Sequence, residues 1–153
     1  MKHVPVMSPM KVAVVEREVA KFKEYCKAGF PYERFGVLLG VMSEDKWNFM
    51  VSRIWMPDED STKKWCKKDR VYVPDEWWAE AQDEAEEHEL MVVGDVHSHC
   101  FEGPSDGVRS ERDLRYSQWW AIEGVVVLWP ARTRLVSRVR WWGPIVPLES
   151  YSL

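Results

Sequence analysis

Two histidines separated by one residue are the part of the sequence best suited to bind a metal ion. His97 and His99 end an apolar run that begins at Met91, and this pattern predicts a strand. Since residues two apart on a strand project from the same face, the two imidazoles would lie side by side. Neutral imidazole nitrogens suit zinc, and a carboxylate is a common third ligand. The pair therefore predicts two ligands of a zinc site, although His-x-His alone is common on exposed strands without any function.

A third ligand is available in the acidic stretch that follows. Asp113 stands three residues after Ser110. A catalytic zinc needs three protein ligands and one open position for water, so Asp113 would complete a set with His97 and His99. Taken alone, Ser110 and Asp113 form a helix start close to the capping-box pattern. The two interpretations are compatible, because the first turn of a helix is a rigid place from which to present a ligand.

The residues next to the two histidines are weaker candidates for metal ligands. Cys100 carries a thiol that zinc accepts, but alternation along the strand would turn it away from the histidines. Ser98, between the two histidines, would also face away and is expected only to pack. Asp95 shares the face of His97, where it would either orient the imidazole as an outer hydrogen-bond partner or lie in solvent.

In combination and in order, these motifs resemble the JAMM metallopeptidases, the catalytically competent branch of the MPN (JAB) domain family. The pattern of that family is a Glu far upstream, then His-x-His, and then Ser-x-x-Asp after seven intervening residues. Here Glu33 stands shortly before Gly36-Val37-Leu38-Leu39-Gly40, which matches the family's Gly-x-Leu-x-Gly signature. His97-Ser98-His99 and Ser110-x-x-Asp113 follow. The resemblance covers about residues 12 to 130 and rests on four motif pieces in the right order.

Two features depart from the family pattern. Cys100 follows the second histidine, where the family usually has Pro, and ten residues rather than seven separate His99 from Ser110. The added residues fall in a stretch rich in turn-forming Gly and Pro, where a longer loop costs little closure entropy. An alignment on Pro104-Ser105 would put Val108 at the ligand position, and valine cannot bind metal.

The resemblance implies an activity, a cofactor and roles for two further residues. It implies one zinc ion on His97, His99 and Asp113, with a water whose pKa falls to about 7. It implies that Glu33 takes the proton of this water as general base. Ser110 would donate a hydrogen bond to the oxyanion of the tetrahedral intermediate. The implied substrate is a peptide or isopeptide bond at the C-terminus of a ubiquitin-like protein. Without the resemblance, Glu33 is an ordinary surface residue before a strand.

Two other functions are open at this point. Some MPN domains lack the ligands and serve as non-catalytic scaffold or assembly modules, whereas every ligand type is present here. A zinc hydrolase acting on a small molecule or nucleobase is the third hypothesis. Nucleobase deaminases combine their ligands with Pro-Cys-x-x-Cys, and this sequence contains no Cys-x-x-Cys.

The elements that must position these residues are predicted from periodicity. Helical spacing of apolar residues, strand-like runs of β-branched and aromatic residues, and a Pro-Asp helix start each have a physical basis. The expected order is a helix over 11–27, strands over 34–41 and 46–56, a surface loop over 58–70, a helix over 75–88, a strand over 90–99, a helix over 110–120, strands over 123–129 and 135–142, and an irregular Pro-rich tail from 143. This order predicts an α/β fold with a single mixed central sheet flanked by helices. The resemblance adds an MPN/JAB-like, cytidine-deaminase-like α/β/α architecture.

Composition bounds the class of protein. The chain has 153 residues, of which 46% are hydrophobic and 30% charged, which suits a single domain over 1–153. A net charge of −4 without a basic run argues against a nucleic-acid partner. No apolar segment is long enough to span a bilayer. Three scattered cysteines and an N-terminus without a signal-peptide pattern predict a reducing, cytoplasmic setting.

Aromatic and basic residues raise the question of partners. Most of the ten tryptophans are expected to fill the core, and any exposed ring would offer a contact for a homodimer or another protein. The oligomeric state is left open. The loop over 58–70 and the segment over 100–109 are expected to flank a substrate groove. The first of these carries Lys63, Lys64, Lys67 and Lys68 beside Trp65. These cations would receive an acidic or amphipathic protein, or would simply be solvated.

Overall fold

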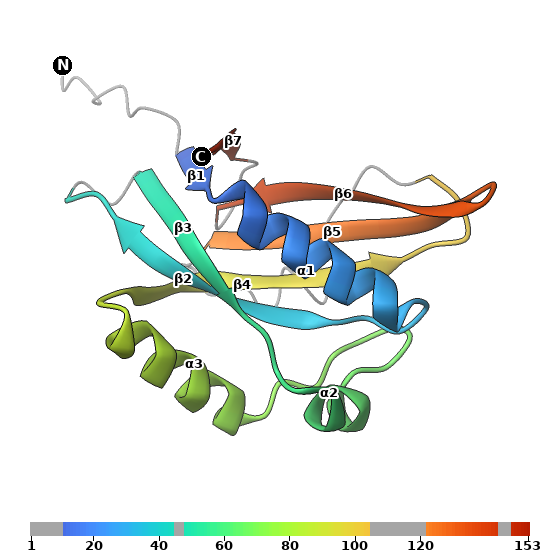
Figure 1. The fold of residues 1–153 in the computed structure, drawn as a ribbon, viewed down its shortest axis with the longest axis horizontal. Helices are drawn as coiled ribbons and strands as arrows, with labels where there is room; N and C mark the ends of the chain where they lie inside the picture. The colour runs from blue at the N-terminus through green and yellow to red at the C-terminus, as the bar shows by residue number, and fades with distance from the viewer. Residues whose placement is uncertain (1–10, 45–47, 105–121, 144–147) are drawn as a thin grey trace, which may run out of the picture.

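A seven-stranded mixed sheet forms the centre of the computed structural model, which describes residues 11–44, 48–104, 122–143 and 148–153 (Figure 1). The strand order is β6-β5-β4-β2-β3-β1-β7. The strands are β1 (Lys11–Val14), β2 (Phe35–Met42), β3 (Asn48–Trp55), β4 (Met91–Cys100), β5 (Ile122–Ala131), β6 (Arg134–Trp142) and β7 (Glu149–Ser152). The helices of the described ranges are α1 (Glu16–Gly29), α2 (Glu59–Trp65) and α3 (Asp75–Glu87). The predicted fold class, one mixed sheet flanked by helices, is confirmed.

The two faces of the sheet carry separate hydrophobic cores, because side chains alternate along each strand. Leu38 of β2 packs with Phe22 of α1 in one core. Val37 and Leu39 pack with Trp77 of α3 in the other. We call these sides the α1 face and the α3 face. The two helices therefore cover opposite faces of the sheet.

Strand β4 carries both histidines and is paired on both of its edges. It runs antiparallel to β2, with Phe35 opposite His97, and parallel to β5, with Val125 opposite His97. Phe35 belongs to the core under α3. The His97 side of β4 is therefore the α3 face, and two hydrogen-bonded neighbours hold the strand in place.

The surface loop predicted over 58–70 is wrong, because this stretch contains α2. The Asp58 side chain caps the helix by accepting a backbone N–H of the first turn at 2.8 Å. Thr62 and Cys66 are buried, and the Thr62 hydroxyl lies 2.6 Å from that of Tyr25 on α1. A helix this short depends on tertiary contacts, which its polar, Lys-rich sequence does not reveal.

The helix predicted over 11–27 begins later than expected. Residues 11–14 form β1, which pairs parallel with β3, and α1 starts at Glu16. Val12 and Val14 are buried on alternate positions of β1. Two valines spaced for a strand also fit the start of a helical pattern, which explains the error.

The end of the chain also differs from the prediction of an irregular tail. Strand β7 pairs parallel with β1 at the edge of the sheet. The helix predicted over 110–120 lies outside the described residues. Within the ranges that the structure describes, no helix is long and apolar enough to cross a membrane.

The tryptophans are core residues wherever the structure describes them. Trp77 and Trp141 are buried, and their neighbours Trp78 and Trp142 are partly buried. No tryptophan of the described ranges is exposed. The large exposed aromatic side chains of these ranges are instead Tyr32, Tyr72, Phe101 and Tyr151.

Candidate metal centre

The two imidazoles lie side by side, as the alternation of β4 predicts. The Nε2 atoms of His97 and His99 are 2.9 Å apart, and the ring centroids are 4.7 Å apart. His99 is buried and His97 partly buried. Two nitrogens bound to one tetrahedral zinc ion lie about 3.3 Å from each other. The pair therefore needs to open by only a few tenths of an ångström to share an ion.

Glu33 is held next to the histidine strand. Its side chain is buried, and its backbone N–H donates to the Lys67 carbonyl at 2.8 Å. The Ser98 N–H donates to the Arg34 carbonyl at 2.9 Å, and the Arg34 N–H donates to the Ser98 hydroxyl at 2.8 Å. These bonds continue the β2–β4 pairing, so the backbone of Glu33 comes opposite His99. Ser98, expected only to pack, in fact ties the Glu33 segment to β4.

Arg34 fixes the same segment from the other side. Its guanidinium makes a two-pronged ion pair with Glu59 of α2, with N···O distances of 2.8 and 3.0 Å. It also donates to the backbone carbonyl of Tyr25 at 3.0 Å, and its central carbon lies 4.5 Å from the centroid of the Tyr25 ring. A planar guanidinium held by several partners has little freedom. Glu33 is therefore attached to a segment that α1, α2 and β4 all hold.

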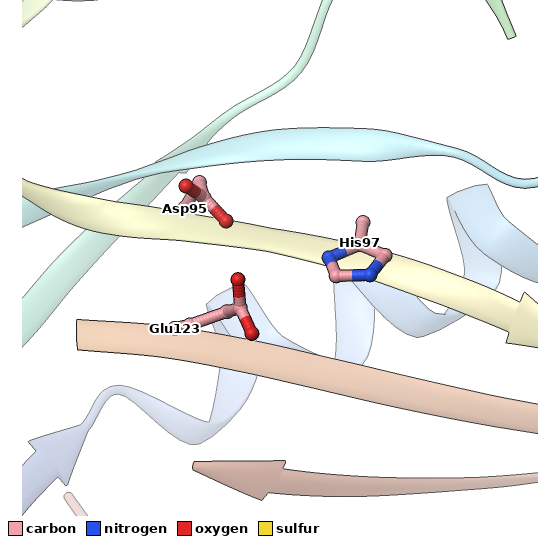
Figure 2. A group of neighbouring side chains, drawn as sticks. All are labelled: Asp95, His97 and Glu123. Carbon is pink, nitrogen blue, oxygen red and sulfur yellow. The ribbon is translucent and has the colours of Figure 1, made fainter. Parts of the chain in front are cut away.

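Two carboxylates lie on the other side of His97. Asp95 and Glu123 are opposite each other in the parallel β4–β5 pair. With His97 they form a group whose ligand atoms all lie within 4.8 Å of one another. Figure 2 shows the two carboxylates facing each other, with one ring nitrogen of His97 on their side. Such a group of two carboxylates and an imidazole could bind a metal ion.

The sequence suggests only part of this carboxylate group. The spacing of Asp95 from His97 places Asp95 on the same strand face as the histidine. For Glu123, the sequence predicts only that it begins a strand. The local signal for Glu123 is one carboxylate before a run of apolar residues, and its side chain is indeed buried. Its partnership with Asp95 depends on the β4–β5 register, which the local sequence does not encode.

Cys100 lies on the opposite face from the histidines, as predicted. It packs against the core under α1, and its Sγ is 3.6 Å from the Tyr32 carbonyl. Burial raises the pKa of the Cys100 thiol to about 12, and the Glu33 carboxylate adds to the rise.

Exposed aromatic and basic side chains adjoin this end of β4. The ring of Phe101 meets that of His99 edge-on, with centroids 6.1 Å apart. Tyr32, next to Glu33, is exposed, and the Lys68 ammonium lies 5.7 Å from its ring centroid. Both segments expected to flank a groove thus contribute residues next to Glu33 or His99. Asp113 and Ser110 lie outside the described residues, so their roles as third ligand and oxyanion donor stay predictions.

Comparison with known proteins relates the chain to others through its fold. No family model and no curated protein sequence matches it. The structure is similar to that of protein DSY2949 from Desulfitobacterium hafniense, with a TM-score of 0.63 at 14% identity, covering 93% of this chain and 92% of that one. It is also similar to AF2198, a JAB1/MPN domain protein from Archaeoglobus fulgidus, with a TM-score of 0.52 at 16% identity, covering 94% and 99%. At such identities the likeness concerns architecture alone, and the chain has an MPN-like fold.

Proposed function

We propose that this chain is a JAMM-type zinc metallopeptidase that hydrolyses a peptide or isopeptide bond at the C-terminus of a ubiquitin-like protein. The observation that carries the proposal is the 2.9 Å approach of the Nε2 atoms of His97 and His99 on an MPN-like fold. The buried Glu33 opposite His99 supports a hydrolytic rather than a purely structural use of this pair.

The donor set suits zinc and its chemistry. His97 and His99 supply two imidazoles, and Asp113 is the proposed third ligand, which together make a common catalytic set with one open position. When bound, zinc supplies Lewis acidity and lowers the pKa of water to about 7. The carboxylates of the partly buried Asp95 and the buried Glu123 favour the presence of a cation in their neighbourhood.

Glu33 accepts the proton in this proposal and later returns it to the leaving amine. A general base works only if its carboxylate keeps its position relative to the reacting atoms. The hydrogen bonds from Arg34 to Ser98 and from Glu33 to Lys67 supply that rigidity. Ser110 would stabilise the oxyanion by donating a hydrogen bond.

The surroundings of the site suit a protein substrate. Tyr32 and Phe101 are exposed beside Glu33 and His99, and the Lys68 ammonium lies 5.7 Å from the centroid of the Tyr32 ring. Exposed aromatic side chains are enriched at surfaces that bind other proteins. In this proposal the tail of the ubiquitin-like protein would contact these rings, and its scissile bond would lie over the histidines.

The test combines metal analysis with hydrolysis of a ubiquitin C-terminal aminocoumarin amide and of diubiquitin. The wild-type chain should bind about one zinc ion. Glu33→Gln should retain the zinc and lower kcat by about 10²–10⁴-fold, because it removes a general base. Glu80→Gln, at an exposed position on α3, is the matched control and should keep full activity.

Two results would count against this function. Full activity in Glu33→Gln would remove that residue from the mechanism. A wild-type chain without a tight zinc site would favour the non-catalytic alternative, an MPN-type scaffold or assembly module.

A further inference from the structure

The two ring nitrogens of His97 face different groups. Nε2 lies 2.9 Å from the Nε2 of His99. In Figure 2 the nitrogen on the other side of the ring, Nδ1, is turned toward Asp95 and Glu123. The ligand atoms of these three residues all lie within 4.8 Å of one another. His97 therefore stands between its fellow histidine and a pair of carboxylates.

We propose that Asp95 and Glu123 are positioning residues, which accept the Nδ1–H of His97 and thereby leave its Nε2 free of hydrogen for zinc. This inference rests on the proposed function and assigns residues to it that the Glu, His-x-His, Ser-x-x-Asp pattern does not contain. A neutral imidazole carries one hydrogen, so a hydrogen bond that holds this hydrogen on Nδ1 fixes the tautomer that binds metal through Nε2. Such outer carboxylates also orient the ring and increase its basicity.

The β4–β5 register explains why two carboxylates meet at this point. Asp95 precedes His97 by two residues and shares its face, and Glu123 lies directly opposite Asp95 on β5. Glu123 is 6% exposed. Asp95 is partly buried, and two carboxylates so close and so shielded from water repel each other unless a donor or cation compensates them. The polarised N–H of a zinc-bound imidazole is such a donor, since hydrogen bonds with a charged partner are about twice as strong as neutral ones.

The competing interpretation is that Asp95, His97 and Glu123 themselves hold the metal. In it, His99 would not bind the metal and would only exchange a hydrogen bond with His97 over the 2.9 Å between their Nε2 atoms. The positioning role uses both contacts of His97 at once, since each of its nitrogens then has a separate task.

Zinc affinity separates the two interpretations without any measurement of catalysis. The probe is zinc alone, titrated in competition with a chromophoric chelator, and the variants are Asp95→Asn, Glu123→Gln, the double variant and His99→Ala. Glu80→Gln is again the matched control. The circular dichroism spectrum and melting temperature of each metal-free variant establish that it is folded. If the double variant fails to fold, the two single variants alone decide between the interpretations.

The positioning role predicts that Asp95→Asn and Glu123→Gln each weaken zinc binding by about 10–100-fold while one ion still binds. His99→Ala should abolish tight binding. Wild-type affinity in both single variants and in the double variant would overturn the inference and leave the proposed function standing. Retention of zinc by His99→Ala, with its loss in Glu123→Gln, would overturn it in favour of the carboxylate site. A wild-type chain that binds no zinc would overturn the proposed function and this inference together.

Discussion

At the scale of single residues, the site depends on side chains that no catalytic pattern names. Ser98 lies between the two histidines and is completely buried on the α1 face. Its hydroxyl accepts the Arg34 N–H at 2.8 Å, and this bond helps to set where Glu33 stands. The alternation of β4 thus gives its two faces different tasks, metal binding on one and attachment of the Glu33 segment on the other.

Replacing Ser98 by Ala tests that attachment. The change deprives the buried Arg34 N–H of its acceptor, which should lower the free energy of unfolding by about 1–3 kcal/mol. Zinc affinity should stay within about twofold of wild type, because the imidazoles are untouched. The kcat should fall by about tenfold or more, since a misplacement of about 1 Å costs on the order of a hundredfold in rate.

Denaturant unfolding, chelator competition and hydrolysis assays give the three values for Ser98→Ala. Ser150→Ala, at an exposed position on β7, is the control. Unchanged kcat together with the expected loss of stability would show that Ser98 holds the fold without positioning Glu33.

At the scale of elements, β4 and β5 approach each other closely where the carboxylate pair forms. Gly94 lies opposite Ile122, one residue before Asp95 and Glu123. A Cβ added at Gly94 would collide with the carbonyl oxygen and carbonyl carbon of Ile122. These are backbone atoms, which cannot move away by a side-chain rotation. Glycine at this position therefore allows the spacing on which the Asp95–Glu123 contact depends.

Gly94→Ala should push the first residues of β5 away from β4. We expect a loss of about 1–3 kcal/mol in the free energy of unfolding, the usual cost of overpacking. Zinc affinity should also fall by up to about tenfold, because Glu123 moves relative to His97. Gly103→Ala is the control, since a Cβ there meets no atom within 4 Å. Wild-type stability in Gly94→Ala would contradict the close approach of the two strands.

The same elements show which parts of the fold and of the candidate site can be predicted from the sequence. The side-by-side histidines and the turning away of Cys100 follow from the two-residue period of a strand, which is a local property. By contrast, α2, β1 and β7 are short and owe their stability to neighbours distant in sequence, such as Tyr25 beside Thr62. The contact between Asp95 and Glu123 likewise needs the register of two strands that are not consecutive in a hairpin. Local spacing thus predicts which residues share a face, and only tertiary pairing determines what lies opposite them.

At the scale of the whole molecule, the two faces of the sheet each enclose a thiol. Cys26 is buried in the core under α1, and Cys66 is buried in the core under α3. Burial raises the pKa of Cys66 from an ordinary 9.0 to about 12, and it raises the pKa of Cys26 as well. Both folded cores therefore hold their thiols protonated at a pH where the unfolded chain would lose those protons.

This difference predicts that the metal-free protein loses stability as the pH rises above about 9. Below pH 9 both states keep the thiol protons, so the contribution of the two groups is fully present. Between pH 9 and 12 the unfolded state releases the protons first, and each thiol lowers the free energy of unfolding by at most about 1.4 kcal/mol per pH unit. Cys100, whose pKa is also raised to about 12, adds to the loss over the same range, equally in wild type and in the double variant below. The phenol of Tyr25 has a raised pKa as well, but its ordinary value is 10.0, so it adds to the loss only at higher pH. Urea unfolding between pH 8 and 10 therefore isolates the thiols.

The double variant Cys26→Ala/Cys66→Ala should be less stable at pH 8, because it leaves cavities, yet show a shallower decline toward pH 10. The same slope in wild type and variant would mean that other groups cause the decline, and that the thiols do not stay protonated in the two cores.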